Sequence, residues 1–270
     1  MGRKKREWPL FFLCLSAALY GLALIFSATR YEETLHGLVG KQAVALGGGV
    51  VLCLLLSVLD VRKLLEKLWW LLPVVNVGLL LLLVPLGNDD GTGNKSWISL
   101  PGGGFNLQPA EVVKISFLLL LALQLRKLGE KGLNRPKAVF LLLLHVLALC
   151  ALLYGVSGDI GMVAVYLAVY LVMLWSAGVH PLWLLGEVAA GVGAVVLLWP
   201  RLPEYVRMRF LVVFDHGLDP LGKGFQQERS LLAIGSGQVT GQGYLQGTQT
   251  QSPSPSALPA RHTDFIFSVA

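Results

Sequence analysis

Long apolar runs, separated by short turns rich in lysine and arginine, constrain this chain more than any other feature of its sequence. A helix needs about 20 mostly apolar residues to cross the hydrocarbon core of a membrane. Runs of this kind fall near residues 9–29, 37–58, 68–87, 109–127, 137–155, 160–178 and 181–200. The pattern predicts an all-α, polytopic integral membrane protein with about seven transmembrane helices.

The composition supports lipid as the main solvent of the chain. Hydrophobic residues make up 54% of the sequence and charged residues 14%, whereas a soluble domain carries about 25% charged residues. The net charge of +6 would also suit nucleic acid, but the cations cluster between apolar runs, so we expect no nucleic-acid partner. The three cysteines, Cys14, Cys53 and Cys150, lie in apolar stretches without metal-ligand spacing and read as small hydrophobic residues.

The positions of the cations predict an orientation in the membrane. Those at residues 3–6, 62–67 and 126–137 fall on one side if the runs alternate, and the positive-inside rule makes that side cytoplasmic. The basic start could open a signal peptide, but the length of the first run favours an uncleaved first helix. We therefore expect a transmembrane helical region over 1–200 and a large extracytoplasmic loop over 201–270 that leads into a further helix.

The outer segment 88–108 and the helix after it contain candidate functional residues. Pro109 and Glu111 suit the start of a helix, and Glu111 can pair with Lys114 one turn later. This pair is either a structural contact or, because charges at membrane depth are costly, part of a polar cavity. Trp97 is either a functional residue or, equally well, an aromatic anchor at the membrane interface. Asp159 is either an N-cap or a functional carboxylate near the outer face.

The large outer loop combines arginines, glycines and one acid. Its glycine run at 235–243 lacks a strand–turn–helix context, so a dinucleotide or P-loop site is excluded; close backbone approach to a ligand or plain flexibility explains the glycines. Asp264 stands in a polar turn directly before an apolar segment, where partial desolvation would suit a general base. The alternative is a cap for the next helix.

Taken together, these segments resemble the SEDS (RodA/FtsW) family of peptidoglycan glycosyltransferases. The matching pieces are QPAE at 108–111, FQ at 225–226, AIGSG at 233–237, GTQ at 247–249 and HTDFIF at 262–267. The GTQ element favours the RodA-like branch. In four places the chain departs from the family pattern. Gly158 stands where proline precedes Asp159, Ala110 replaces a serine, Gln238 replaces the last glycine of Gly-Ser-Gly-Gly, and the glutamate that usually precedes the His-Thr-Asp motif is replaced around Ala260. The family has about ten spans, so the chain resembles a C-terminally truncated member.

The resemblance implies polymerisation of lipid II, an undecaprenyl-pyrophosphate-linked substrate, with Asp264 as general base and a class B penicillin-binding protein as partner. Leaving-group charge would need cations, for which Lys114, Arg207 and Arg209 are candidates, or a divalent metal such as Mg²⁺ or Mn²⁺. The residues expected at the substrate are Trp97, Glu111, Lys114, Asp159, Arg207, Arg209, Gln226, Ser230, Gly235, Ser236, Gly237, Thr248, Gln249, His262 and Thr263.

Two other functions compete with the polymerase. A lipid II flippase or other transporter would place ionisable groups near the bilayer midplane, whereas here the polar residues concentrate in outer loops. A non-catalytic membrane scaffold of the cell-wall machinery would need no carboxylate at position 264.

Overall fold

The computed structural model describes residues 8–32, 35–88, 94–99, 105–129, 132–202, 204–254 and 256–270, except for the side chains of His36, Arg62, Tyr205, Arg209 and Lys223. The chain divides into two compact units. Unit 1 comprises Met1–Leu59 and Leu198–Ala270, and unit 2 comprises Asp60–Leu197. Each unit is described by itself. The division concerns packing rather than membrane topology, so the boundary expected near residue 200 stays a prediction.

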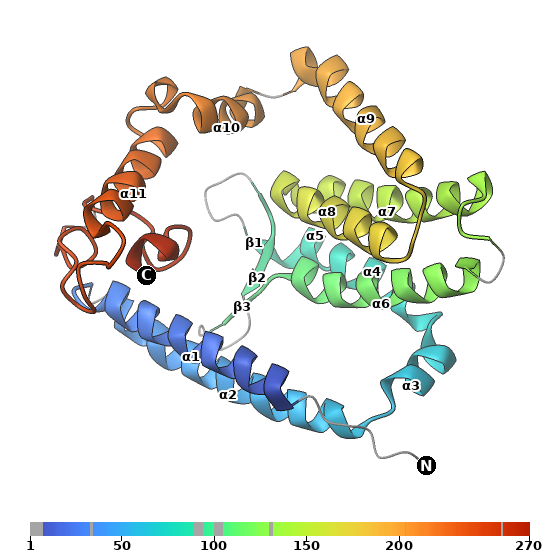
Figure 1. The fold of residues 1–270 in the computed structure, drawn as a ribbon, viewed down its shortest axis with the longest axis horizontal. Coiled ribbons are helices and arrows are strands. Elements are labelled where there is room, and N and C mark those ends of the chain that lie inside the picture. Colours follow the sequence, from blue (N-terminus) through green and yellow to red (C-terminus); the bar gives the residue numbers. More distant parts are fainter. Residues whose placement is uncertain are drawn as a thin grey trace. The chain divides into compact units, whose positions relative to one another are not determined.

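Unit 2 is a helical bundle. Its elements are α3 (Val61–Leu68), α4 (Leu71–Leu81), α5 (Leu83–Leu86), α6 (Pro109–Gly129), α7 (Pro136–Ser157), α8 (Ile160–Ser176) and α9 (Pro181–Leu198). Helices α6, α7 and α8 lie side by side, with α4 packed on α6 (Figure 1). The core between them is built on fully buried large side chains such as Phe117, Leu142 and Tyr166.

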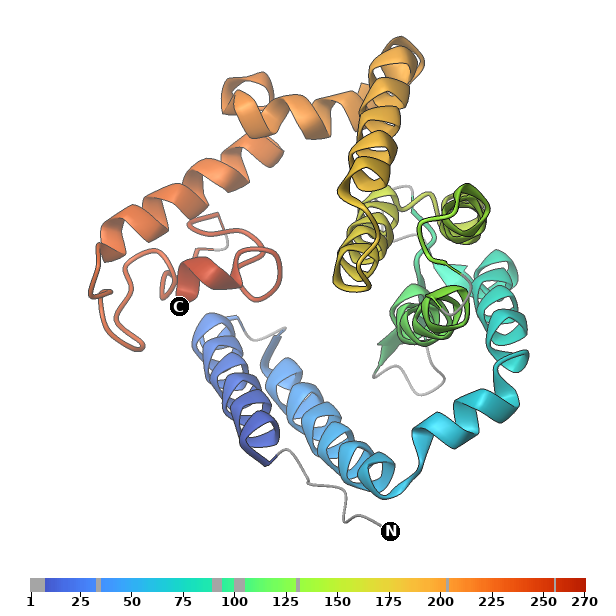
Figure 2. The same ribbon diagram turned by 45° about the vertical axis from the view of Figure 1, so that its right-hand side comes forward.

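Unit 1 pairs two long helices with the C-terminal segment. Helix α1 (Trp8–Thr29) lies beside α2 (His36–Val58) (Figure 2). The C-terminal segment contains η2 (Trp199–Arg201), α10 (Glu204–Phe214), η3 (His216–Leu218), α11 (Lys223–Gly237) and η4 (Ile266–Val269). The η4 helix contacts both α1 and α11.

All seven apolar runs predicted from the sequence are helical, although the third is interrupted at Leu82, between α4 and α5. In the part of the chain that the structure describes, four helices are long and apolar enough to cross a membrane: Trp8–Thr29, Gly37–Val58, Pro136–Ser157 and Pro181–Arg201. Their apolar side chains are widely exposed, for example Leu13 at 67% and Val196 at 66%, as expected of surfaces that face lipid. The prediction of an all-α, polytopic membrane protein is confirmed.

Three features were not predicted. A three-stranded antiparallel sheet closes the outer segment: β1 (Gly87–Asn88), β2 (Trp97–Ser99) and β3 (Asn106–Leu107), with Ile98 opposite both Gly87 and Leu107. The short helix α3 precedes α4, and α10 and α11 occupy the predicted loop. These elements are too short or too polar to give an apolar run of membrane length.

The turn between α7 and α8 is set by two adjacent residues. Gly158 ends α7 with a φ of 71°, a left-handed conformation that glycine adopts at no steric cost. Asp159 then caps α8, because its Oδ1 accepts a hydrogen bond of 3.1 Å from the Met162 backbone N–H. The interpretation of Asp159 as an N-cap is confirmed.

Polar side chains join neighbouring helices inside the apolar bundle of unit 2. The Ser116 hydroxyl of α6 donates to the Asn76 side chain of α4. His145 Nδ1 of α7 lies 2.8 Å from Gln124 Oε1 of α6. The Tyr170 hydroxyl of α8 donates to Glu187 Oε1 of α9 at 3.1 Å. Each contact fixes the register of two helices that apolar packing alone would leave free to slide.

The contact between α8 and α9 can be tested by a double-mutant cycle with Tyr170→Phe and Glu187→Met, since methionine has a similar shape but no oxygen to accept from the tyrosine hydroxyl. Interhelical hydrogen bonds of this kind have coupling energies of about 0.6 kcal/mol and at most about 1.7 kcal/mol. We expect a coupling in this range when unfolding is measured in mixed detergent micelles. Tyr154→Phe, which removes an exposed hydroxyl, is the control and should leave stability unchanged. Strictly additive losses would contradict the contact.

Candidate functional site

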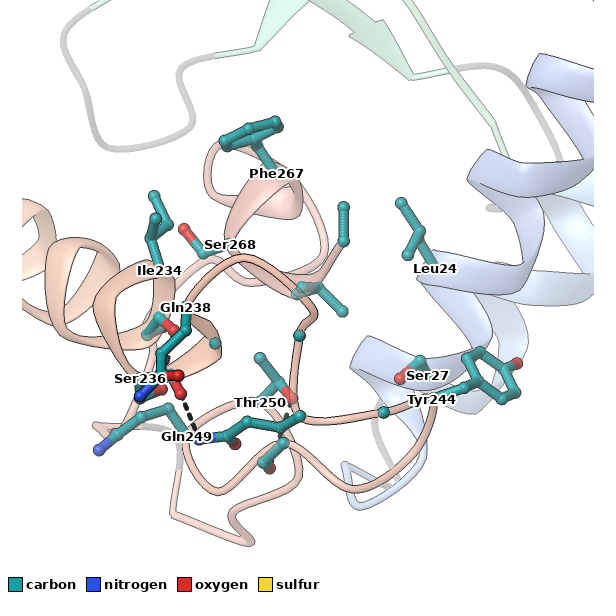
Figure 3. A pocket seen from close by; sticks show the side chains of 18 of the residues that line it. Leu24, Ser27, Ile234, Ser236, Gln238, Tyr244, Gln249, Thr250, Phe267 and Ser268 are labelled. Atoms are coloured by element: carbon teal, nitrogen blue, oxygen red, sulfur yellow. Dashed lines mark hydrogen bonds between the residues drawn. The ribbon is translucent and has the colours of Figure 1, made fainter.

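A cavity of about 450 Å³ lies in unit 1 between α1, the end of α11, the loop that follows α11, and η4. Figure 3 shows Leu24 and Ser27 of α1 facing the loop, with Phe267 and Ser268 beside α11. Its lining is mixed, because apolar side chains alternate with hydroxyls, side-chain amides and the peptide groups of several glycines. Such a wall can bind a ligand that carries many hydroxyl and amide groups.

The start of α11 depends on a glycine. A Cβ at Gly224 would lie 2.1 Å from the His216 carbonyl oxygen and 2.6 Å from that of Asp219. No other residue fits this approach of two backbone segments. Further along α11, the hydroxyl of Ser230 lies 2.7 Å from that of Ser268, which joins this helix to η4.

Gln242 organises the loop after α11. Its Nε2 donates to the Ser236 carbonyl oxygen at 3.1 Å. Its Oε1 accepts from the Thr248 backbone N–H at 2.7 Å and from the Thr248 hydroxyl at 3.3 Å. One side chain therefore connects the predicted site segments 235–237 and 247–249.

The same loop is docked on the end of α1. The Tyr244 hydroxyl donates to the Ala23 carbonyl oxygen at 3.3 Å. Gln251 Nε2 donates to the carbonyl oxygen of Ser27 at 3.1 Å and to its hydroxyl at 2.9 Å. The loop that forms one wall of the cavity is therefore hydrogen-bonded to α1 at two points.

Arg261 is the most deeply buried cation among the described residues, at 2% exposure. Its Nη1 donates to the backbone oxygens of Thr250 at 3.0 Å and Ser252 at 2.7 Å. Its Nη2 lies 3.8 Å from a carboxylate oxygen of Glu32, in the turn after α1. Arg261 directly precedes the 262–264 motif, so this guanidinium fixes the motif to both the loop and the α1 end.

The motif forms an exposed turn. The backbone N–H groups of Thr263 and Phe265 both donate to the Ala260 carbonyl oxygen, at 3.1 and 3.2 Å. His262 is half-buried, whereas Thr263 and Asp264 are exposed. Asp264 does not line the cavity described above, and its side chain is exposed on an anchored turn. Its role as general base stays a prediction.

The structure brings part of the predicted set together. Ser236, Gly237 and Gln249 line the cavity, while Ser230 and Thr248 are bonded to residues that line it. Gly235 lies between Ile234 and Ser236, which both line the cavity, and Gln226 sits in the first turn of α11. The residues that sequence reasoning missed are the braces Gln242, Gln251 and Arg261 with Glu32; only the position of Arg261 beside the motif gave a signal.

The predicted cations have different surroundings. Arg207 lies in α10, and its Nε is buried without a hydrogen-bond partner in the described part of the chain. The Arg209 side chain lies outside the described residues. Lys114 Nζ is 2.8 and 2.9 Å from the two carboxylate oxygens of Glu111, which confirms the expected pair. Because Glu111 neutralises Lys114 in this way, Arg207 is the better candidate for binding an anionic group.

Three more predicted residues belong to unit 2. Asp159 Oδ2 accepts long hydrogen bonds from Gln108 Nε2 at 3.4 Å and from the Ser96 hydroxyl at 3.5 Å. Ser96 itself is 5% exposed. Trp97 follows in β2 and is 37% exposed. Asp159 therefore joins the starts of β2, α6 and α8, while Glu111 lies in the first turn of α6.

Metal ligands do not gather in the described residues: no group of three or more His, Cys, Asp or Glu side chains is placed to hold an ion. A divalent cation at this site would therefore need a substrate to supply most of its ligands.

Comparison with known proteins gives a family for these features. The profile of FtsW/RodA/SpoVE, described as a cell cycle protein, matches residues 8–270. The "Probable peptidoglycan glycosyltransferase FtsW" of Geobacter metallireducens is 31% identical over 276 residues, which cover 97% of this chain and 70% of that protein. The protein of the same name from Escherichia coli O6:H1 is 33% identical over 191 residues, covering 71% and 44%.

Solved structures agree. A chain of a peptidoglycan synthase complex, from work on the structural coordination of polymerization and crosslinking, superposes with a TM-score of 0.73 at 31% identity, covering 99% of this chain and 70% of that one. The rod shape determining protein RodA of Thermus thermophilus superposes with a TM-score of 0.56 at 27% identity, covering 72% of this chain and 60% of that one. The relatives named here carry both FtsW and RodA names, so the RodA-like branch stays a prediction.

Gln238, which stands where the family pattern has glycine, gives a testable prediction. It ends α11 with φ 54° and ψ −139°, a conformation that strains residues other than glycine by about 1–3 kcal/mol. We expect Gln238→Gly to stabilise the protein by about 1 kcal/mol, because part of the relieved strain is offset by the entropy of glycine in the unfolded chain. Thermal unfolding in detergent measures this. Gln226→Gly, inside α11, should destabilise instead, and equal effects would contradict the assignment.

Removal of the Arg261 guanidinium should loosen the motif locally. We expect Arg261→Met to raise amide hydrogen exchange across residues 247–265 by about ten-fold or more, since a hydrogen bond from a charged donor contributes about 1.5–3 kcal/mol. Arg229→Met, which removes a cation stacked 4.9 Å from the Phe225 ring, is the matched control. Unchanged exchange in the Arg261 variant would show that the guanidinium does not hold the turn.

Proposed function

This chain belongs to the FtsW/RodA/SpoVE family, and from that premise we propose that it is a peptidoglycan glycosyltransferase that polymerises lipid II into glycan strands. We further propose that it is a multi-pass protein of the bacterial cell membrane, with its N-terminus in the cytoplasm and residues 201–270 on the outer side. The distribution of lysine and arginine supports this orientation.

One observation carries the assignment of Asp264 as general base. Its exposed turn directly follows Arg261, whose guanidinium is 2% exposed and bonded to two backbone oxygens. A catalytic carboxylate must be both accessible to its substrate and held in position. Asp264 meets both conditions, because Arg261 holds the turn in position while the Asp264 side chain stays exposed.

The reaction assigns one task to this carboxylate. A sugar hydroxyl of the acceptor attacks the anomeric carbon of the donor, and the bond from that carbon to the lipid pyrophosphate breaks. The pyrophosphate leaves with the electron pair, and the hydroxyl proton passes to Asp264. The acid can then release the proton to water.

The leaving pyrophosphate needs positive charge around it. Arg207 suits this task because its Nε has no acceptor in the described part of the chain, and Arg209 lies two residues further along α10. Lys114 contributes less, because Glu111 already pairs with it at 2.8 Å. The cavity in unit 1, with its hydroxyls and glycine peptides, would bind sugar or peptide groups of the substrate.

Mg²⁺ or Mn²⁺ remains part of the proposal only as an ion carried by the substrate. Pyrophosphate oxygens and one carboxylate would hold it, and it would neutralise the leaving group. The steps described for Asp264 do not depend on it.

The proposed partner is a class B penicillin-binding protein, which would cross-link the strands as they emerge. A solved relative of this chain comes from a peptidoglycan synthase complex that coordinates polymerization and crosslinking, which supports this pairing. Sequence element 247–249 supports placing the protein in the RodA-like branch.

The test is polymerisation of lipid II by the full-length protein purified in detergent. We expect Asp264→Asn to lower the rate by about 10²–10⁴-fold, the usual contribution of general-base catalysis, with unfolding temperature unchanged. Asp215→Asn is the control, because Asp215 lies in the same segment, 201–270. Its side chain accepts a hydrogen bond from the Gly217 N–H, and the oxygen of an asparagine side chain can accept it too. Its rate should match that of the unmodified protein.

Other outcomes separate the competing functions. Lipid II crossing the bilayer without polymer formation, in protein that is folded, would favour a transporter. A strain that keeps its growth and shape with Asp264→Asn would favour a scaffold. Either result would contradict the proposed catalysis.

A further inference from the structure

Helix α3 has two chemically distinct faces. Its eight residues place Val61, Leu64, Leu65 and Leu68 at the spacing of one helical stripe, and Arg62, Lys63, Glu66 and Lys67 on the other side. Trp69 and Trp70 follow at once. A basic, amphipathic helix followed by tryptophan is the pattern of a helix that lies in the plane of a membrane surface.

The apolar face of α3 is only partly covered by the bundle of unit 2, because Leu65 and Leu68 are half-buried and the other apolar side chains are exposed. Val61 is 36% exposed, Leu64 49%, Trp69 45% and Trp70 56%. In Figure 1, α3 extends away from the packed helices α4, α6 and α7, to which it is connected through α4. Exposed leucine and tryptophan in these amounts require an apolar neighbour.

The connections of α3 identify that neighbour. Two residues separate it from the end of α2 at Val58, and two separate it from the start of α4 at Leu71. The flanking segments, Gly37–Val58 and Leu71–Leu86, are both apolar, and the first is long enough to cross a membrane. A helix this closely joined to both must lie at the lipid boundary, whatever the arrangement of the two units.

The acids next to α3 make contacts of their own, and its lysines stay at the surface. Asp60 caps the helix and accepts from the Lys63 backbone N–H at 3.4 Å. Glu66 Oε1 lies 2.8 Å from Arg126 Nη1, at the end of α6. Lys63 Nζ lies 3.6 Å from Asp60 Oδ2, but the Lys63 side chain is 82% exposed, and an exposed pair of this kind is weak enough to be exchanged for a lipid phosphate. Lys67 is exposed as well.

The end of α6 adds a further cation. Lys127 Nζ lies 4.4 Å from the centroid of the Trp69 ring, which is a cation–π distance. Together with the Arg126–Glu66 ion pair, this contact joins the end of α3 to the end of α6. Lys67 follows Glu66 and Lys127 follows Arg126 in the sequence, so both lysines belong to this junction. The lysines of both elements then face the same layer, with a tryptophan at headgroup depth between them.

We propose that Lys63, Lys67 and Lys127 form a binding site for anionic phospholipid headgroups on the cytoplasmic leaflet. The leucines of α3 enter the acyl region, Trp69 and Trp70 lie at the interface, and the ammonium groups contact lipid phosphates. This site is independent of the catalytic role of Asp264 and uses none of its residues.

Native mass spectrometry of the full-length protein, titrated with phosphatidylglycerol or phosphatidylcholine, measures the site. We expect preferential retention of phosphatidylglycerol, and Lys63→Gln/Lys67→Gln should weaken it by about ten-fold or more, since each lysine near an anionic surface contributes about five-fold. Lys63→Arg/Lys67→Arg should restore it. Lys41→Gln/Lys95→Gln, with the same change in net charge, should leave it unchanged. Equal losses in the two glutamine pairs would overturn the site, as would no loss in either.

A second measurement tests the orientation of α3 and does not depend on lipid affinity. In a background without Cys14, Cys53 and Cys150, a bimane label is placed at Leu64→Cys or at Lys63→Cys, and the protein is reconstituted in phosphatidylglycerol/phosphatidylcholine vesicles. We expect nitroxide lipids to quench the label at position 64 and aqueous iodide to quench the label at position 63. Iodide quenching of both, or lipid quenching of neither, would overturn the proposal.

Discussion

Hydrocarbon offers no hydrogen-bond partners, and this constraint accounts for the polar contacts between helices in the apolar bundle of unit 2. Side chains that carry donors or acceptors there meet one another across helix pairs, as Ser116 meets Asn76 and Tyr170 meets Glu187. Outside the bundle, where water is available, the chain can use glycine-rich loops and exposed acids. The same solvent boundary therefore separates the part that gives rigidity from the part that can carry chemistry.

The helices that cross the membrane could be predicted from the sequence because apolar length is a direct consequence of bilayer thickness. The elements outside the apolar runs could not. The sheet around Ile98 has strands of two or three residues, and α11 is interspersed with glycine and polar residues. Elements of this kind are stabilised by contacts between residues distant in sequence, so the local pattern of hydrophobic residues does not predict them.

The site shows a similar division. Ser236, Gly237 and Gln249 could be predicted because they belong to recognisable motifs, and they do line the cavity. Gln242 and Arg261 could not, since their importance comes from partners on other segments: Thr248 for the first, Glu32 for the second. Chemistry-bearing residues follow patterns along the chain, whereas the residues that position them are defined only by the folded loop.

Asp159 occupies the point where three segments meet. One carboxylate oxygen accepts from the Met162 N–H in the first turn of α8. The other accepts from Ser96, directly before β2, and from Gln108, directly before α6. This side chain therefore connects the loop that contains Ser96 to both α6 and α8. A pull on that loop, from a growing polymer or a docked protein, would be transmitted through it to α6 and α8 together.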